Sequence, residues 1–208
     1  MKKYLYNGEM FWRRFGYPLA GVDEAGRGPL AGPVVAAAVI LPKNLSTEIF
    51  SGLADGKTIS ASRRLKLYSE IIRIAPAVSW AVVSPAVIDR INILSATLLA
   101  MRRAVERLKI KPNLVLVDGN KSIPRLEVSQ VALVDADAKI PAVVCAGIVA
   151  KVIRDDLMKK YHQIFPEYNF IQHKGYGTRQ HYQLLRRYGL CPIHRRSFCN
   201  VPGTGKIV

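Results

Sequence analysis

The sequence lacks any apolar stretch approaching 18 residues without charge or proline, so no transmembrane helix is expected. The first residues, Met1-Lys2-Lys3-Tyr4, lead into no apolar segment of the kind a secretory signal peptide requires. Cysteine is also scarce, because Cys145, Cys191 and Cys199 are odd in number and form no Cys-x-x-Cys pair. Neither a disulfide framework nor a zinc site is indicated. These absences predict a cytoplasmic protein with reduced thiols.

Acidic residues are few as well: Asp and Glu total 15 against 31 Lys and Arg, which gives a net charge of +16. Charge of this size on a folded domain favours a polyanionic partner, and nucleic acid is the first candidate. The alternative is a basic surface that only keeps the protein soluble. Half of the 208 residues are apolar, so the chain can bury a core, and its length suits a single domain over residues 1–208.

The hydrophobic pattern predicts a mixed α/β order. Two buried strands are expected within residues 19–41, interrupted by a turn at Gly26-Arg27-Gly28-Pro29. Further strands are expected at residues 80–84, 114–117 and 128–134. Helices are expected at residues 62–74, 92–109, 141–165 and 179–188. In the first of these helices, the expected buried stripe is Leu65, Tyr68, Ile71 and Ile72.

Four carboxylates stand at or just beyond the ends of the predicted strands: Asp23, Glu24, Asp118 and Asp137. Strand ends flanked by small residues are where an α/β sheet commonly binds its ligands. Carboxylates that converge without a His or Cys partner suit hard cations such as Mg²⁺ or Mn²⁺. Taken singly, each has a structural alternative, either a solvated turn or an exposed strand edge.

Two questions about these acids stay open from the pattern alone. Adjacent residues of a regular strand point to opposite faces, so Asp23 and Glu24 share a site only at a bulge or a strand end. Asp135 and Asp137, two residues apart, would share one face of a strand. Periodicity does not decide which of those two is a ligand.

Seven short motifs, in order, cover nearly the whole chain from about residue 19 to residue 198. They read GVDEAGRGPLAGP, DRINIL, VDGN, DAK, AK, HKGYGT and PIHRRSF, and they begin at Gly21, Asp89, Val117, Asp137, Ala150, His173 and Pro192. In order and spacing, these motifs closely resemble the ribonuclease HII family, and the first of them alone is highly specific.

The resemblance implies a ribonuclease H-like fold, a mixed five-stranded sheet flanked by helices, with a small helical C-terminal region at roughly residues 175–208. It also implies a four-carboxylate catalytic and metal-binding site at Asp23, Glu24, Asp118 and Asp137, since the Asp-Ala-Lys context favours Asp137 over Asp135. The residues it implies in substrate binding are Gly26, Arg27, Gly28, Lys57 and Tyr176. The glycine-rich turn would approach a 2′-hydroxyl through backbone groups, and the tyrosine would pack on the sugar.

The implied activity is that of a metal-dependent endoribonuclease. It would hydrolyse the RNA strand of RNA–DNA hybrids and incise DNA duplexes 5′ to an embedded ribonucleotide, acting as a monomer. Two ions, Mg²⁺ or Mn²⁺, would activate a water and stabilise the leaving 3′-oxygen, giving 5′-phosphate and 3′-hydroxyl ends. The alternatives are a nucleic-acid-binding protein without catalysis, or another two-metal nuclease.

Five positions depart from the residues usual in the family: Gly56, Thr58, Asp135, Gly147 and Ile153. Gly147 stands where the family usually has Ser, and Thr58 replaces a cation. None of the five removes a predicted metal ligand, so they bear on affinity, metal preference and rate.

The segment His194-Arg195-Arg196 allows two interpretations, a grip on phosphates or an anchor of the C-terminal segment to the core. The other histidines, His162, His173 and His181, have no metal-ligand spacing and are expected to be structural or on the surface.

Overall fold

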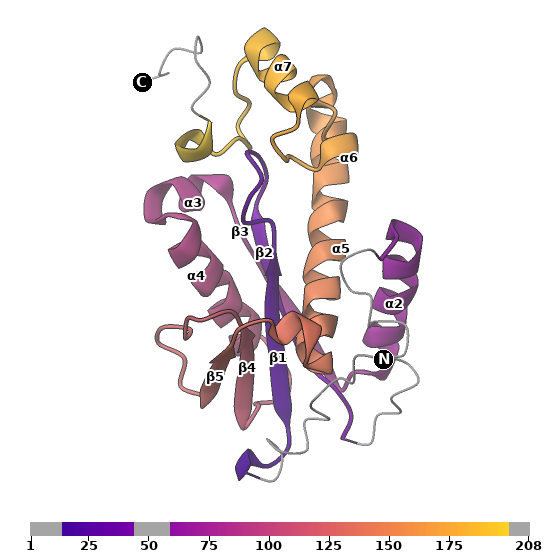
Figure 1. Ribbon diagram of the computed structural model, residues 1–208, viewed down its shortest axis with the longest axis vertical. Helices are drawn as coiled ribbons and strands as arrows, with labels where there is room; N and C mark the ends of the chain where they lie inside the picture. The colour runs from indigo at the N-terminus through magenta and orange to yellow at the C-terminus, as the bar shows by residue number, and fades with distance from the viewer. Residues whose placement is uncertain (1–13, 44–58, 200–208) are drawn as a thin grey trace.

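The computed structural model describes residues 14–43 and 59–199 (Figure 1). Within this part of the chain, five strands form one mixed sheet in the order β3-β2-β1-β4-β5. Their bounds are β1 Leu19–Ala25, β2 Val34–Ile40, β3 Ala77–Val83, β4 Leu114–Asp118 and β5 Gln130–Leu133. No helix among these residues is long and apolar enough to cross a membrane.

The pairing of the strands places two of the predicted acids at one edge of the sheet. Strands β1, β2 and β3 pair antiparallel in sequence order, whereas β4 pairs parallel to β1 and β5 parallel to β4. Because β1 and β4 run in the same direction, their carboxyl ends lie side by side. The mixed five-stranded sheet implied by the motifs is confirmed.

Helices cover both faces of this sheet. On one face lies α4 (Ile93–Glu106), preceded by the short α3 (Pro85–Ile91). On the other lies the long α5 (Pro141–Ile164), with α2 (Ala61–Ile74) on its outer side (Figure 1). Every residue of β2 is buried, as its continuous apolar run predicts for a strand covered on both faces.

The approach of α5 to β1 depends on Gly21. A Cβ atom at this position would meet the backbone of Ala142 and Val143 in the first turn of the helix. The strand residue facing the helix therefore has to be the smallest one, since the obstacle is backbone rather than a movable side chain.

The chain after α5 folds back over the far end of that helix. It forms α6 (Phe170–His173), α7 (Arg179–Tyr188) and the 3₁₀ turn η4 (Arg196–Phe198), which lie together above the sheet in Figure 1. These elements share a core with Leu30 and Ala31 of the β1–β2 loop. The N–H groups of Leu30 and Ala31 both donate to the Gly175 carbonyl, at 2.8 and 3.3 Å. The C-terminal region and the glycine-rich loop are thus one packed unit.

The expected elements are present, with differences in detail. Helix α3 was not predicted, and β3 begins three residues before the expected strand, at Ala77. The stripe predicted for α2 is wrong in part, because Leu65 and Ile72 are 49% and 43% exposed while Leu67 is buried. Helix α2 packs mainly on α5, so it buries a narrower face than a helix lying on the sheet.

Replacing Gly21→Ala is expected to destabilise the protein by about 1–3 kcal/mol, because the added methyl forces β1 and α5 apart. Chemical denaturation of the two forms measures the loss. The matched control is Gly28→Ala, where a Cβ meets nothing within 4 Å. An unchanged free energy of unfolding in Gly21→Ala would contradict the close contact.

Candidate active site

Asp23 and Asp118 are neighbours at the carboxyl edge of the sheet. Val22 is paired with Val117 in the parallel β1–β4 ladder, so the next residues of the two strands, Asp23 and Asp118, stand beside each other. Asp23 lies two residues beyond Gly21 and therefore points to the same face, toward α5. There its Oδ2 atom occupies the space that a Cβ atom would need at position 147, which only a glycine leaves open.

Asp137 joins this edge through a backbone contact. Its N–H donates to Oδ1 of Asp118 at 3.2 Å. The residue lies on a 3₁₀ turn, η2 (Ala136–Ala138), and not on the strand that was expected to run into it. Asp135 has a left-handed backbone, φ 58°, and its exposed side chain lies 4.0 Å from the Lys139 ammonium. The expectation that Asp135 and Asp137 share a strand face is therefore wrong.

Glu24 stands at the strand end rather than at a bulge. Its pairing with Ala36 is regular, one residue before the end of β1. Its N–H donates to Oδ1 of Asp23 at 2.6 Å, and its own Oε1 accepts from Arg27 Nη1 at 3.3 Å. The structure thus leaves Glu24 paired with the arginine of the glycine-rich turn.

Burial and mutual repulsion disfavour the charged forms of these acids. Burial raises the pKa of Asp23 well above its ordinary value, and the charges of Glu24, Asp118 and Asp137 raise it further. Burial also raises the pKa of Glu24, which Arg27 opposes. The pKa of Asp118 is raised by burial, against the hydrogen bond from the Asp137 N–H. A bound cation would relieve this repulsion.

The carboxylates suit a hard cation by chemistry, because all of their donors are oxygen atoms. They do not form a finished cage. The described residues contain no group of three or more His, Cys, Asp or Glu side chains arranged to hold a metal ion.

Tyr176 lies near the same edge, along one side of α5. Its ring is 44% exposed, and the Lys151 ammonium and the Arg154 guanidinium lie 5.9 and 5.8 Å from the ring centroid. Lys151 stands one helical turn, about 6 Å, beyond Gly147 on the same side of α5. Helix α5 therefore touches Asp23 at one turn and Tyr176 at the next.

Lys57, also predicted to bind substrate, lies outside the described residues, as do Gly56 and Thr58. The segment His194-Arg195-Arg196 is described. His194 and Arg195 are buried and Arg196 is exposed, so for the first two the anchoring interpretation is confirmed.

Sequence reasoning missed a chain of hydrogen bonds behind Tyr176. The Cys191 N–H donates to His194 Nδ1 at 2.9 Å, and the Nε2 atoms of His194 and His181 are 3.0 Å apart. His181 Nδ1 meets the Tyr176 carbonyl at 2.9 Å. These partners assign one proton to each ring: His194 donates from Nε2, and His181 donates from Nδ1.

Burial keeps both rings neutral, lowering the pKa of His181 and of His194 to about 4. His173 stacks on His181, and its Nε2 donates to the Tyr168 carbonyl at 2.7 Å. His173 and His181 are thus structural, as expected. The three imidazoles hold the loop that presents Tyr176.

Solved structures share this fold. Ribonuclease H2 from Pyrococcus horikoshii OT3 superposes with a TM-score of 0.72 and 30% identity, covering 86% of this chain and 92% of that one. RNase HII from Archaeoglobus fulgidus, solved as a PCNA:RNase HII complex, gives a TM-score of 0.74 and 27% identity over 88% and 96% of the two chains. The fold and its acidic sheet edge define a ribonuclease of the ribonuclease H-like class.

The family follows from the sequence comparisons. The family model described as Ribonuclease HII matches residues 20–201. Ribonuclease HII of Polaromonas sp. strain JS666 is 53% identical over 183 residues, 88% of this chain and 90% of the relative. That of Syntrophus aciditrophicus strain SB is 52% identical over 180 residues, 86% and 83% of the two chains. The chain belongs to the ribonuclease HII family and is a ribonuclease, a hydrolase.

Acid is expected to destabilise the protein through the histidine chain. Since the pKa values of His181 and His194 are lowered in the folded state, the unfolded state binds more protons below pH 6.5. The two histidines therefore lower the free energy of unfolding as the pH falls from 6.5 toward 4, and they have no such effect above pH 6.5. Denaturation at several pH values should show a smaller acid loss in His194→Gln than in the wild type. His162→Gln, outside the chain of bonds, should keep the wild-type slope.

Removing one carboxylate is expected to stabilise the metal-free protein. Asp118 has a raised pKa when folded, so the free energy of unfolding falls as the pH rises from its ordinary pKa through the raised one, and the full cost of its charge is present above the raised pKa. Asp118→Asn keeps an acceptor for the Asp137 N–H and should unfold at a higher temperature than the wild type in EDTA at pH 7. Asp156→Asn, at an exposed residue of α5, is the control. A lower unfolding temperature in Asp118→Asn would argue against repulsion at this edge.

Proposed function

We propose that the protein hydrolyses the RNA strand of RNA–DNA hybrids and incises DNA duplexes 5′ to embedded ribonucleotides. The observation that supports this best is the assembly on α5. Asp23 lies against Gly147, and Tyr176 lies over Lys151 one turn further on. A nuclease that recognises the sugar beside the cut needs its carboxylates and its sugar-binding residue close together, here about one helical turn apart along α5.

The proposed metal ligands are Asp23, Glu24, Asp118 and Asp137, and the proposed ions are two Mg²⁺ or Mn²⁺. A divalent ion bound there supplies an activated water and stabilises the leaving oxygen. A structure of Bst-RNase HIII, 16% identical and with a TM-score of 0.65, was solved in complex with Mn²⁺. The products would carry 5′-phosphate and 3′-hydroxyl ends.

The chain's own residues bind and orient the nucleic acid. The net charge of +16 attracts the polyanion, and exposed basic side chains such as Arg196 contact phosphates. Tyr176 packs its ring on the sugar, and the backbone of Gly26-Arg27-Gly28 reads the 2′-hydroxyl. Lys57 is proposed as a further substrate contact. The protein is proposed to act as a cytoplasmic monomer, its single domain including the C-terminal region.

Gly147 bears on which of the two proposed ions, Mg²⁺ or Mn²⁺, the site would prefer. Since a Cβ atom at this position would meet Oδ2 of Asp23, a serine there requires the carboxylate to turn away from α5. The glycine thus permits an Asp23 position that a serine excludes. The dependence of cleavage on Mg²⁺ or Mn²⁺ is the property that a serine at position 147 would alter.

The test uses a labelled DNA duplex that contains one ribonucleotide, with Mg²⁺, Mn²⁺ or EDTA. We expect one metal-dependent cut 5′ to the ribonucleotide and none in an all-DNA duplex. Asp118→Asn should lower the cleavage rate by more than about 100-fold, since replacing a residue that only hydrogen-bonds to a metal ligand already lowers metal affinity or activity by about 10–100-fold. Asp135→Asn should cut at nearly the wild-type rate.

Other outcomes select the alternatives. Binding of the duplex with no cut under either metal would favour a nucleic-acid-binding protein. Cleavage of the all-DNA duplex at a similar rate would favour a two-metal nuclease that ignores the 2′-hydroxyl.

A further inference from the structure

Arg195 is a fully buried arginine whose hydrogen-bond acceptors are all backbone carbonyls, and its guanidinium lies 5.1 Å from the centroid of the Phe198 ring. Its Nε donates to the Gly32 carbonyl at 2.9 Å, Nη1 to that of Arg27 at 2.7 Å, and Nη2 to that of Gly26 at 2.5 Å. In the described part of the chain it forms no ion pair with a carboxylate. A planar guanidinium with five fixed donors can hold three carbonyls at once, which an ammonium cannot do in the same geometry.

These bonds fix the direction of two N–H groups. In a trans peptide unit the carbonyl and the following N–H lie in one plane and point in opposite directions. The peptide bonds of the turn are trans. With the Gly26 and Arg27 carbonyls drawn inward to Arg195, the N–H groups of Arg27 and Gly28 point outward.

Among the described residues, both outward N–H groups are open to a ligand. Neither donates a hydrogen bond to any of those residues. A Cβ atom at Gly28 would meet none of them within 4 Å, so they leave the space beside Gly28 free. Two successive N–H groups facing one side form a concave donor pair suited to an oxygen acceptor.

We propose that Arg195 is the positioning residue for sugar discrimination: it aims the Arg27 and Gly28 N–H groups at the 2′-oxygen of the ribonucleotide. The proposal rests on the proposed function, in which this turn reads the 2′-hydroxyl. Arg195 itself does not touch the substrate, because it lies beneath the turn and has no exposed surface.

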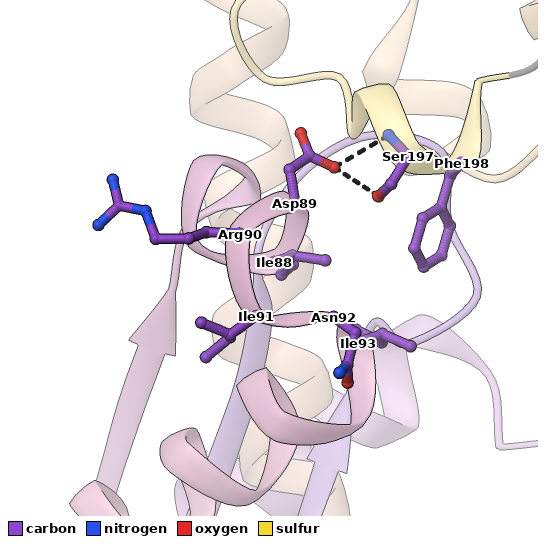
Figure 2. Close-up of a pocket in the computed structure, with 8 residues that line it drawn as sticks. All are labelled: Ile88, Asp89, Arg90, Ile91, Asn92, Ile93, Ser197 and Phe198. Carbon is purple, nitrogen blue, oxygen red and sulfur yellow. Dashed lines mark hydrogen bonds between the residues drawn. The ribbon is translucent and has the colours of Figure 1, made fainter.

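Two other residues allow positioning to be separated from anchoring. Asp89 accepts hydrogen bonds from the Arg196 and Ser197 N–H groups, both at 3.0 Å, and so holds the C-terminal segment without touching the turn. Figure 2 shows its contact with Ser197. Asp89 and Ser197 border a cavity of about 390 Å³ between α3 and η4. Arg196 is exposed and next in sequence, which makes it the control for charge.

The experiment measures dissociation constants for two DNA duplexes that differ only in one 2′-hydroxyl. All variants carry Asp118→Asn to prevent cleavage, with Mg²⁺ present. Arg195→Lys should lower the preference for the ribonucleotide duplex by about tenfold, since a misdirected hydrogen bond loses about that factor. Asp89→Asn and Arg196→Lys should keep the preference within about twofold, even where they weaken both duplexes alike.

The results distinguish this proposal from the proposed function. If the Asp118→Asn protein itself binds both duplexes equally, the reading of the 2′-hydroxyl fails, and Arg195 has no such role. If it discriminates and a folded Arg195→Lys variant discriminates equally well, the role of Arg195 alone is overturned. An equal loss of preference in Asp89→Asn would also overturn it, in favour of general anchoring.

A second measurement needs no change at Arg195. Amide hydrogen exchange, followed by NMR, should show the Arg27 and Gly28 N–H groups exchanging fast in the free protein. The ribonucleotide duplex should slow both, and the all-DNA duplex should not. Equal protection by the two duplexes, or none by either, would overturn the proposal even if Arg195→Lys does not fold.

Discussion

Helix α5 lies against β1 at two glycines, and the positions of the acidic groups depend on this contact. Gly21 admits the first turn of the helix to the strand, and Gly147 leaves room for the Asp23 carboxylate about one turn later. The same side of the helix continues to Lys151 and then to Arg154, which donates to the Lys174 carbonyl. One straight element thereby sets the distance between the acidic edge and the loop of Tyr176.

The parts of the fold predicted best from the sequence are those that a local pattern determines. Strand β2 is apolar throughout because it is covered on both faces, and the last helix ends at Gly189 as its C′ residue predicts. The prediction failed where neighbouring elements decide. Asp137 lies on a 3₁₀ turn held by its bond to Asp118, a partner 19 residues away that no periodicity reveals.

The support behind the predicted site was the least visible part of the sequence. The sequence left open whether Arg195 contacts phosphates or anchors the C-terminal segment, and no pattern marked Arg154 as buried, because buried arginines are rare without acidic partners. Most of the carbonyls that accept from these two side chains lie in the β1–β2 loop, more than 120 residues away in sequence, such as those of Ala31 and Gly32. Any residue supplies a carbonyl, so a motif search has nothing to detect. The histidine chain is hidden for the same reason, since it begins and ends on backbone groups.

Carbonyl partners also have an electrostatic consequence for a protein that meets a polyanion. A carboxylate bonded to Arg195 would satisfy the guanidinium, but it would place a negative charge directly beneath the turn that is proposed to bind nucleic acid. Carbonyl dipoles satisfy the donors without an ion pair, and the Asp89 carboxylate acts on Arg195 only from a distance. Burial and the nearby Arg154 lower the pKa of Arg195 to about 10, so it stays protonated at neutral pH. In the proposed function, Arg195 thus orients the turn and both buried cations add to the attraction for nucleic acid, while the repelling carboxylates lie on the sheet edge where a bound metal would neutralise them.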